Sequence, residues 1–139
     1  MKNLYIIASA AAKNMESETQ IWDELRQKGW NVSDIHEFPR ICSHEIAVTT
    51  PAIAGVIKKR FSIIEKHVVI ICLIPSINKL LKRLQGYPDA VVAEQYDTCS
   101  ELAKISADIC ISSDDMESAA KELVSFIDAK EQDPISCKS

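Results

Sequence analysis

Polar side chains gather where two apolar runs of the chain end, at residues 9–14 and 76–78. Their hydroxyl, amide and ammonium groups, together with backbone N–H groups at helix starts, can hold a small polar or anionic ligand. The same residue types also cap helices when no ligand is present, so each has this second explanation. The candidate ligand-binding residues are Ser9, Lys13 and Asn14 in the first segment and Ser76 and Asn78 in the second.

The turn after the first apolar run contains no glycine and reads ASAAAK over residues 8–13. The whole chain has only Gly29, Gly55 and Gly86, and neither G-x-G-x-x-G nor G-x-x-x-x-G-K-[ST] occurs. A Cβ intrudes where glycine would let backbone amides point at a phosphate. We therefore expect a compact strand-to-helix turn, in which Lys13 is either a solvated loop lysine or a phosphate contact.

The cysteine and histidine residues do not define a metal site or a nucleophile. Cys42, His44 and Glu45 in the segment CSHE, with His36 nearby, are either metal ligands or part of a polar surface loop, and no matching second pair of ligands is visible. Cys99 lies near a predicted helix start, which would lower the pKa of its thiol, but no base accompanies it. Cys72 and Cys110 fall in strand patterns and are predicted to be small buried hydrophobes. We expect no metal and no cofactor, and the sequence identifies no catalytic residue.

Alternating strands and helices must position these side chains. Capping residues and apolar spacing predict helices that start at Asn14 or Ser17, at Thr50-Pro51, at Ser76, at Asp97 or Thr98, and near Met116. Residues 39–49 form the least regular internal segment. Apolar runs predict strands over residues 4–8, 30–38, 67–75, 89–94 and 107–112, the second of them at an edge.

This alternation predicts a three-layer α/β/α sandwich of the flavodoxin-like or Rossmann-like type. Its five-stranded parallel sheet would have the order 2-1-3-4-5, because the first and third runs are the most apolar. Residues 1–128 are expected to form one α/β domain and residues 129–139 a flexible tail. A ligand would bind outside the carboxyl ends of the first and third strands, where the winding reverses. Residues 94–98 and 112–115 would form one wall of this site.

Composition narrows the classes of partner. The chain has 139 residues, 47% of them hydrophobic and 26% charged, and a net charge of −4, which favours neither nucleic acid nor an anionic membrane as a partner. No apolar run reaches the length of a membrane span and no secretory signal pattern is visible. Five cysteines without a C-x-x-C pair fit reduced thiols. We expect a cytoplasmic protein.

Three segments resemble the nucleoside 2-deoxyribosyltransferase-like family: LYIIAS, VVIICLIPS and SELAKISADICISSDDM. The resemblance implies a nucleoside-binding α/β fold and adds Tyr5, with Ser9 and Ser76, as ligand contacts. The family carries a catalytic glutamate in the helix after the middle strand, but here that helix reads INKLLKRLQG and contains no acid. The resemblance therefore implies a relative of N-glycoside transferases and hydrolases that has lost its nucleophile.

There is a second resemblance. The carboxyl half of nucleoside monophosphate kinases is similar to two segments of this chain, IICLIPSINKLLKRL and ADICISSDDMESAAKELVSFI. Without a phosphate loop it implies a kinase-like shell and not an active kinase. Together these observations predict an α/β domain that binds a nucleoside- or nucleotide-like small molecule, with its enzymatic status open. The alternative is a non-catalytic protein-interaction domain that can form homodimers or other homo-oligomers.

Overall fold

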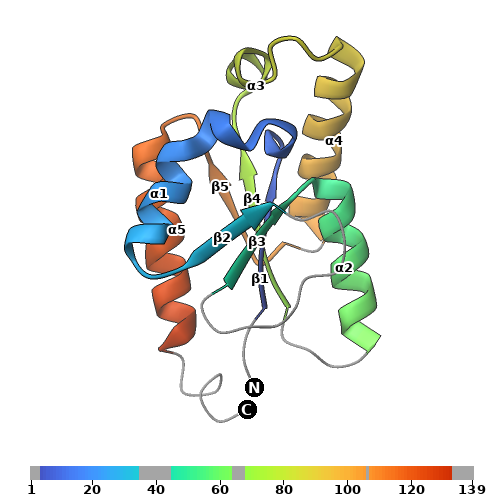
Figure 1. Cartoon of the computed structure of the whole chain (residues 1–139). Helices are drawn as coiled ribbons and strands as arrows, with labels where there is room; N and C mark the ends of the chain where they lie inside the picture. Colours follow the sequence, from blue (N-terminus) through green and yellow to red (C-terminus); the bar gives the residue numbers. More distant parts are fainter. Residues whose placement is uncertain (1–3, 35–44, 64–67, 106, 133–139) are drawn as a thin grey trace.

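A computed structural model of the chain describes residues 4–34, 45–63, 68–105 and 107–132. A central parallel sheet carries helices on both faces (Figure 1). The strands are β1 (Leu4–Ser9), β2 (Asn31–Asp34), β3 (Glu45–Thr49), β4 (Val68–Ile74) and β5 (Ile109–Ser112). The helices are the 3-10 helix η1 (Ala12–Glu18) and the α-helices α1 (Thr19–Gln27), α2 (Pro51–Ile63), α3 (Ile77–Arg83), α4 (Asp89–Ile105) and α5 (Met116–Glu131).

The sheet confirms the predicted three-layer fold with five parallel strands, but its order is β2-β3-β1-β4-β5. The predicted order 2-1-3-4-5 omitted β3, which pairs with β1 on one side and β2 on the other. β3 belongs inside the sheet because its residues from Ile46 to Thr49 are buried. β2 is an edge strand, as predicted, and only Val32 of its four residues is buried.

The predicted neighbourhood of the first strand and the 67–75 strand is confirmed. β1 pairs in parallel with β4 from Leu4–Val68 to Ser9–Leu73. The chain leaves β1 towards α1 on one face, whereas it leaves β3 and β4 towards α2, α3 and α4 on the other. In open α/β sheets, ligands bind where the loops after neighbouring strands leave towards opposite faces of the sheet. In this chain that position is the carboxyl end of β1.

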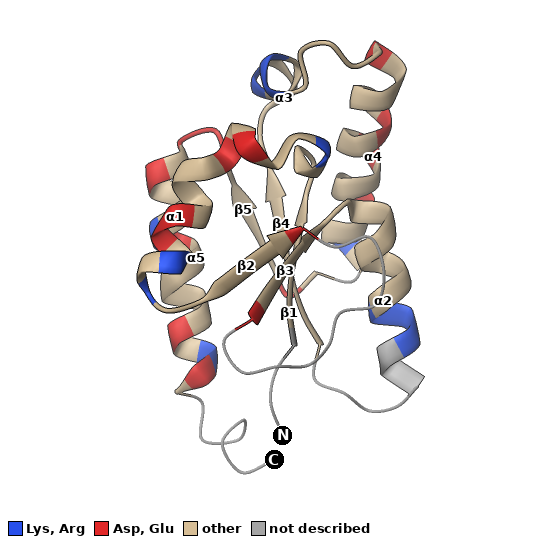
Figure 2. Cartoon of the chain, in the orientation of Figure 1, with Lys and Arg blue, Asp and Glu red and all other residues tan. Residues whose placement is uncertain are grey.

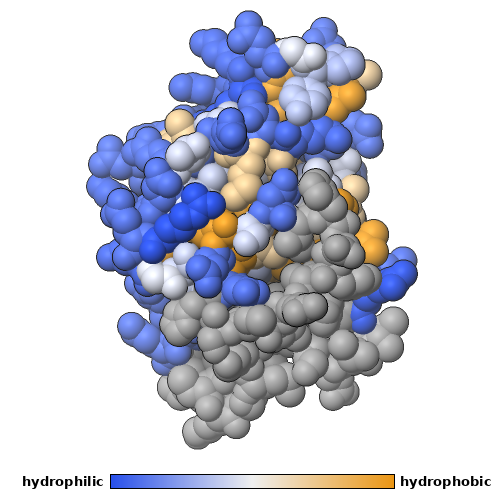
Figure 3. All heavy atoms as spheres, in the orientation of Figure 1, coloured by the Kyte–Doolittle hydropathy of each residue, from blue (hydrophilic) through white to orange (hydrophobic). Residues whose placement is uncertain are grey.

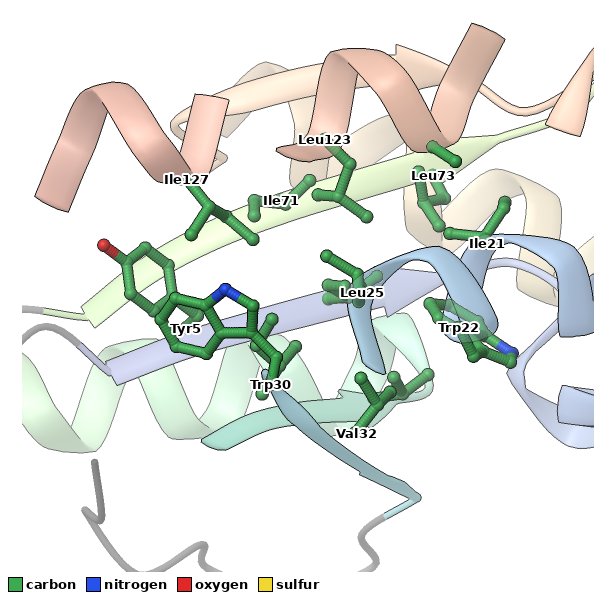
Figure 4. Packing of buried hydrophobic residues seen from close by; sticks show 14 of the residues in the cluster. Tyr5, Ile21, Trp22, Leu25, Trp30, Val32, Ile71, Leu73, Leu123 and Ile127 are labelled. Carbon is green, nitrogen blue, oxygen red and sulfur yellow. The ribbon is translucent and has the colours of Figure 1, made fainter. Parts of the chain in front are cut away.

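Alternation along β1 builds two cores. Tyr5 and Ile7 belong to the core on the α1 and α5 side of the sheet, in which Tyr5 lies beside Trp30 and Ile127 (Figure 4). The alternate residues Ile6 and Ala8 face α2 and α4. Both faces of the strand are buried, which explains its continuous apolar sequence.

Two predicted element assignments are wrong. Residues 89–94 form the first part of α4 and not a strand. Buried Val92, Gln95, Cys99 and Leu102 recur at the spacing of a helix, and Pro88 and Asp89 suit a helix start. Residues 45–49, predicted to be irregular, form β3. The remainder of that segment, with Cys42 and His44, lies outside the described residues.

Several predicted helix boundaries are confirmed. Ser76 caps α3 by accepting a hydrogen bond from the Lys79 backbone N–H at 3.4 Å, and Asp115 caps α5 by accepting one from Glu117. Gly29 and Gly86 follow α1 and α3 with φ of 95° and 98°, a conformation that glycine adopts readily. By contrast, α5 continues to Glu131, past the predicted end of the domain at residue 128.

Candidate functional site

The turn after β1 is closed by its own hydrogen bonds. The backbone N–H of Ala10 donates to the Leu73 carbonyl at 3.3 Å, and that of Ala11 donates to Ser9 Oγ at 3.1 Å. The Asn14 N–H donates to the Ala11 carbonyl at 2.9 Å. Ala10 and Ala11 are fully buried. These amides already have acceptors, so this turn does not present them to a phosphate, as the missing glycines predicted.

A buried polar cluster lies at the carboxyl ends of β1, β4 and β5. Ser9 Oγ donates to Glu18 Oε1 at 2.6 Å, and Arg83 Nη1 donates to Glu18 Oε2 at 3.1 Å. Arg83 also donates to the hydroxyl of Ser113 at 3.1 Å and to the Ser113 carbonyl. Ser9, Glu18 and Ser113 have no exposed surface, and the Arg83 side chain is 9% exposed. We refer to these four residues as the edge cluster.

Burial raises the pKa of the Glu18 carboxyl above its ordinary value of 4.5. The hydrogen bond from Ser9, the positive charge of Arg83 and the Ser113 hydroxyl act in the opposite direction. The carboxylate therefore lies where water is excluded but where each of its two oxygens has a donor. A buried carboxylate without partners would be strongly destabilising, and here its hydrogen bonds and the charge of Arg83 offset that cost.

Other contacts tie the turn after β1 to the end of α3. The Asn14 amide Nδ2 donates to the Arg83 carbonyl at 3.1 Å, and the Tyr87 hydroxyl donates to the Lys13 carbonyl at 3.0 Å. Figure 2 shows the basic residues of α3 and the basic residue after β1 at the same end of the molecule. The Lys13 side chain is exposed there.

Five of the six predicted site residues lie on the two turns at this edge of the sheet, with Lys13 among them, but they do not form one contact set. Ser9 belongs to the edge cluster, Asn14 joins η1 to the end of α3, and Ser76 and Asn78 are exposed at the start of α3. The Ser76 backbone N–H donates to Asp114 Oδ1 at 2.5 Å, which links this turn to the one after β5.

Tyr5 lies away from these residues. It is near the amino end of β1, four residues before Ser9, which corresponds to about 13 Å along a strand. Its hydroxyl donates to Glu131 Oε2 at 2.7 Å, and its ring meets the Trp30 ring edge-on at a centroid distance of 5.5 Å. These contacts give Tyr5 a structural role at the opposite edge of the sheet.

Sequence reasoning missed Glu18, Arg83 and Gln95. Glu18 fitted a favourable first-turn carboxylate, and Arg83 fitted a solvated basic face. Ser113 fell within the predicted wall at residues 112–115, but nothing indicated its partner. Gln95 is 7% exposed, and its Oε1 has no hydrogen-bond partner within the part of the chain that the structure describes. The helical spacing of Val92, Gln95 and Cys99 could have identified it as inward-facing.

Two of the three described cysteines, Cys99 and Cys110, differ from their predicted states. Cys99 lies within α4 and not at a helix start, and its Sγ is 3.7 Å from the carbonyl oxygens of Ala8 and Leu73. A hydrogen bond with Cys72, together with burial, raises the pKa of the Cys99 thiol. Cys72 is buried as predicted, but Cys110 is exposed on β5, the edge strand. Because it is buried and its pKa is raised, Cys99 does not have the surroundings of an activated nucleophile.

Among the described residues, no group of three His, Cys, Asp or Glu side chains is placed to hold a metal ion. Helices in the same residues are too short or too polar to cross a membrane. A hollow of about 570 Å³ lies beside β2, lined by residues that include Arg26, Trp30, Ser33 and Glu45. None of the predicted site residues lines it.

No protein-family profile matches the sequence, and the search of curated proteins finds no match. Solved structures do share the fold. The tunicamycin resistance protein of Deinococcus radiodurans superposes with a TM-score of 0.58 at 13% identity, over 91% of this chain and 96% of that one. A de novo designed protein with the P-loop NTPase fold gives 0.57 at 15% identity, over 93% and 92%. The guanylate kinase of Anaplasma phagocytophilum gives 0.54 at 12% identity, over 94% and 87%.

These similarities assign the chain to the architecture of P-loop NTPase-like folds. At such low identities they describe the fold alone. The resemblance to the carboxyl half of nucleoside monophosphate kinases agrees with this architecture. The resemblance to nucleoside 2-deoxyribosyltransferases stays a prediction.

Proposed function

We propose that this chain binds a nucleoside- or nucleotide-like small molecule at the carboxyl edge of its sheet and does not transfer phosphoryl groups. The observation that carries the proposal is the buried Oε1 atom of Gln95, which has no hydrogen-bond partner among the residues that the structure describes. A buried amide oxygen without a donor costs about 1–3 kcal/mol, and native proteins retain few such groups. A ligand hydroxyl or amino group would supply the missing donor.

The position of Gln95 supports this site. Cys99, one helical turn later on the same face of α4, touches the carbonyls at the ends of β1 and β4. α4 runs from the carboxyl edge of the sheet towards its amino edge (Figure 1), so Gln95 lies about 6 Å closer to the carboxyl edge than Cys99. The side chain is almost closed off, and a ligand would reach it after the amide rotates.

The closed turn after β1 argues against phosphoryl transfer. Enzymes of that class hold phosphates with loop amides and a lysine and stabilise the transferring group electrostatically. Here the amides of Ala10 and Ala11 are used internally. The exposed Lys13 and the lysines of α3 would instead attract an anionic ligand to this edge of the sheet, whereas the base and sugar would account for most of the recognition.

Titration calorimetry with nucleosides and nucleoside monophosphates tests this proposal. We expect measurable binding of at least one of them to the wild-type chain and a loss of about tenfold in affinity in Gln95→Leu. Gln27→Leu, an exposed position at the end of α1, is the matched control and should bind as the wild type does. Absence of binding across the panel would remove the proposal. Added Mg-ATP should give no phosphorylated product.

A second candidate, a protein-interaction or homodimerisation domain, is favoured by exposed apolar side chains on α2 and α4. Val56 is 52% and Ile105 76% exposed. The two helices pack together, because a Cβ at Gly55 would lie 3.7 Å from Leu102 Cδ1. Figure 3 shows apolar patches beside α2 and near α3 within a mostly hydrophilic surface. Light scattering after size exclusion would detect a dimer, and Ile105→Lys should dissociate it.

A further inference from the structure

The edge cluster has the composition of a receptor for an oxyanion. A guanidinium and two hydroxyls, from Arg83, Ser9 and Ser113, converge at the carboxyl ends of three strands. Charge-assisted donors of this kind bind carboxylates and phosphates alike. The anion they hold is the chain's own Glu18 carboxylate, with one oxygen 2.6 Å from Ser9 Oγ and the other 3.1 Å from Arg83 Nη1.

We propose that Glu18 is the built-in occupant of an oxyanion subsite, and that a phosphate group binds to Arg83, Ser9 and Ser113 when Glu18 is removed or displaced. The inference deepens the proposed function and rests on it in one respect, because the subsite would hold the phosphate of the nucleotide-like ligand. The subsite itself is defined by the three donors and can be probed with inorganic phosphate alone.

The segment that carries Glu18 is suited to such a displacement. η1 is a 3-10 helix in which Asn14 has a non-helical conformation, with φ −131° and ψ 75°. Neither Ala11 at the start of η1 nor Glu18 at the start of α1 provides a side-chain cap. Short 3-10 segments have poorer hydrogen-bond geometry than α-helices and often mark hinges. Glu18 thus lies at the junction of η1 and α1, which no side-chain cap closes, and η1 is held by side-chain hydrogen bonds of Asn14 and Trp22.

Arg83 is held independently of Glu18. Its guanidinium also donates to the hydroxyl and the carbonyl of Ser113, which lies on the turn after β5. Loss of the carboxylate therefore leaves the guanidinium near its present position, with donors directed at the vacated volume. An unpaired buried cation attracts an anion strongly.

The experiment measures phosphate binding to the full chain. Isothermal titration with inorganic phosphate, at constant ionic strength set by sodium chloride, is run on the wild type, Glu18→Ala and Glu18→Gln. We expect Glu18→Ala to bind phosphate at least about tenfold more tightly than the wild type and to gain thermal stability with phosphate but not with chloride. Glu16→Ala, an exposed acid on the same 3-10 helix, is the matched control and should behave like the wild type.

The specificity of the effect is tested by removing the cation. Arg83→Met combined with Glu18→Ala should abolish the gained phosphate affinity. If neither Glu18 variant folds in chloride, refolding in phosphate provides the readout: rescue by phosphate supports the subsite, and failure of rescue overturns it. Folded Glu18 variants that bind no phosphate also overturn it.

The outcome separates the subsite from the proposed function. Phosphate binding by Glu18→Ala, together with no nucleoside or nucleotide binding by the wild type, would retain the subsite and remove the proposed function. Nucleoside binding that depends on Gln95, without phosphate binding by the Glu18 variants, would do the reverse.

Discussion

Glu18 and Arg83 lie 65 residues apart in the sequence, yet their side chains form a buried ion pair with 3.1 Å between Oε2 and Nη1. The pair joins η1 to α3 across the ends of the central strands. It lies beside the turn after β1, where the sequence lacks the glycines of a phosphate cradle. The position at which open α/β sheets accept ligands is therefore partly occupied by charged side chains of the chain itself.

Removal of the cation should destabilise the fold strongly. Arg83→Met leaves the fully buried Glu18 carboxylate without its counter-charge, and breaking a buried pair in this way costs about 3–5 kcal/mol. Lys82→Met, an exposed neighbour on α3, is the matched control and should change the free energy of unfolding by less than about 0.5 kcal/mol. Urea denaturation at pH 7 measures both. Equal, small effects would contradict the structure of the pair.

The pH dependence of stability should carry a contribution from Glu18. Its pKa in the folded state is raised above 4.5, so between these two values the folded chain binds more protons than the unfolded chain. The free energy of unfolding therefore falls as pH rises from 4.5 through the folded pKa. Glu18→Gln lacks this term, so its stability relative to the wild type should increase with pH over that window. Denaturation at several pH values checks this, with the exposed Glu16→Gln as the control.

Substitution of Gln95 should lower the affinity for the ligand without lowering the thermal stability of the fold. Gln95→Leu removes a buried amide oxygen that has no partner in the described part of the chain and puts an apolar group of similar size in its place, so thermal unfolding should occur at the same temperature or higher. Ligand affinity should fall, as described above. A marked loss of stability would mean that Gln95 has a structural partner.

Tyr5→Phe should affect stability and not ligand binding. The substitution removes the hydroxyl that donates to Glu131 at 2.7 Å and keeps the ring contact with Trp30. We expect a loss of about 1 kcal/mol in the free energy of unfolding. Calorimetric affinities for nucleosides should be unchanged, because Tyr5 lies at the amino edge of the sheet. A weakened affinity would instead support the contact that the transferase-like resemblance implies.

Thiol labelling should distinguish the cysteines by exposure. In a chain with Cys42 and Cys137 replaced by serine, a maleimide should label Cys110 on β5 and leave Cys72 and Cys99 unmodified until the protein unfolds. Burial raises the pKa of the Cys110 thiol, so its labelling should be slower than that of a free thiol in a peptide. Mass spectrometry of the labelled peptides identifies the sites. Rapid labelling of native Cys99 would show that α4 opens.

The layers of the fold followed from patterns that are local in sequence. Continuous apolar runs identified β1 and β4, and capping residues identified the starts of α2, α3 and α5. The strand order did not follow, because β3 is only five residues long and adjoins a polar segment. The valines at 91 and 92 favoured a strand in the prediction. In the structure these residues belong to α4, which buries Gln95 and Cys99 on one helical face.

The sequence predicted that the turns after β1 and β4 adjoin each other, but it did not predict which side chains meet there. The parallel topology was enough to place the turns after β1 and β4 side by side. The pairing of Glu18 with Arg83 depends on the conformation of η1 and the length of α3, neither of which leaves a pattern in the sequence. The sequence pattern does not distinguish a buried charged residue from a solvated one when the helix that carries it has both apolar and polar residues on the same face.

The most direct test of ligand binding at the carboxyl edge is a two-dimensional ¹⁵N–¹H titration of the wild-type chain with the nucleoside or nucleotide that binds most tightly. We predict shifts in the Gln95 side-chain amide and in backbone amides of the segments after β1 and β4, with those around Tyr5 and Trp30 unchanged. Shifts confined to the amino edge of the sheet, or no shifts at all, would contradict this account.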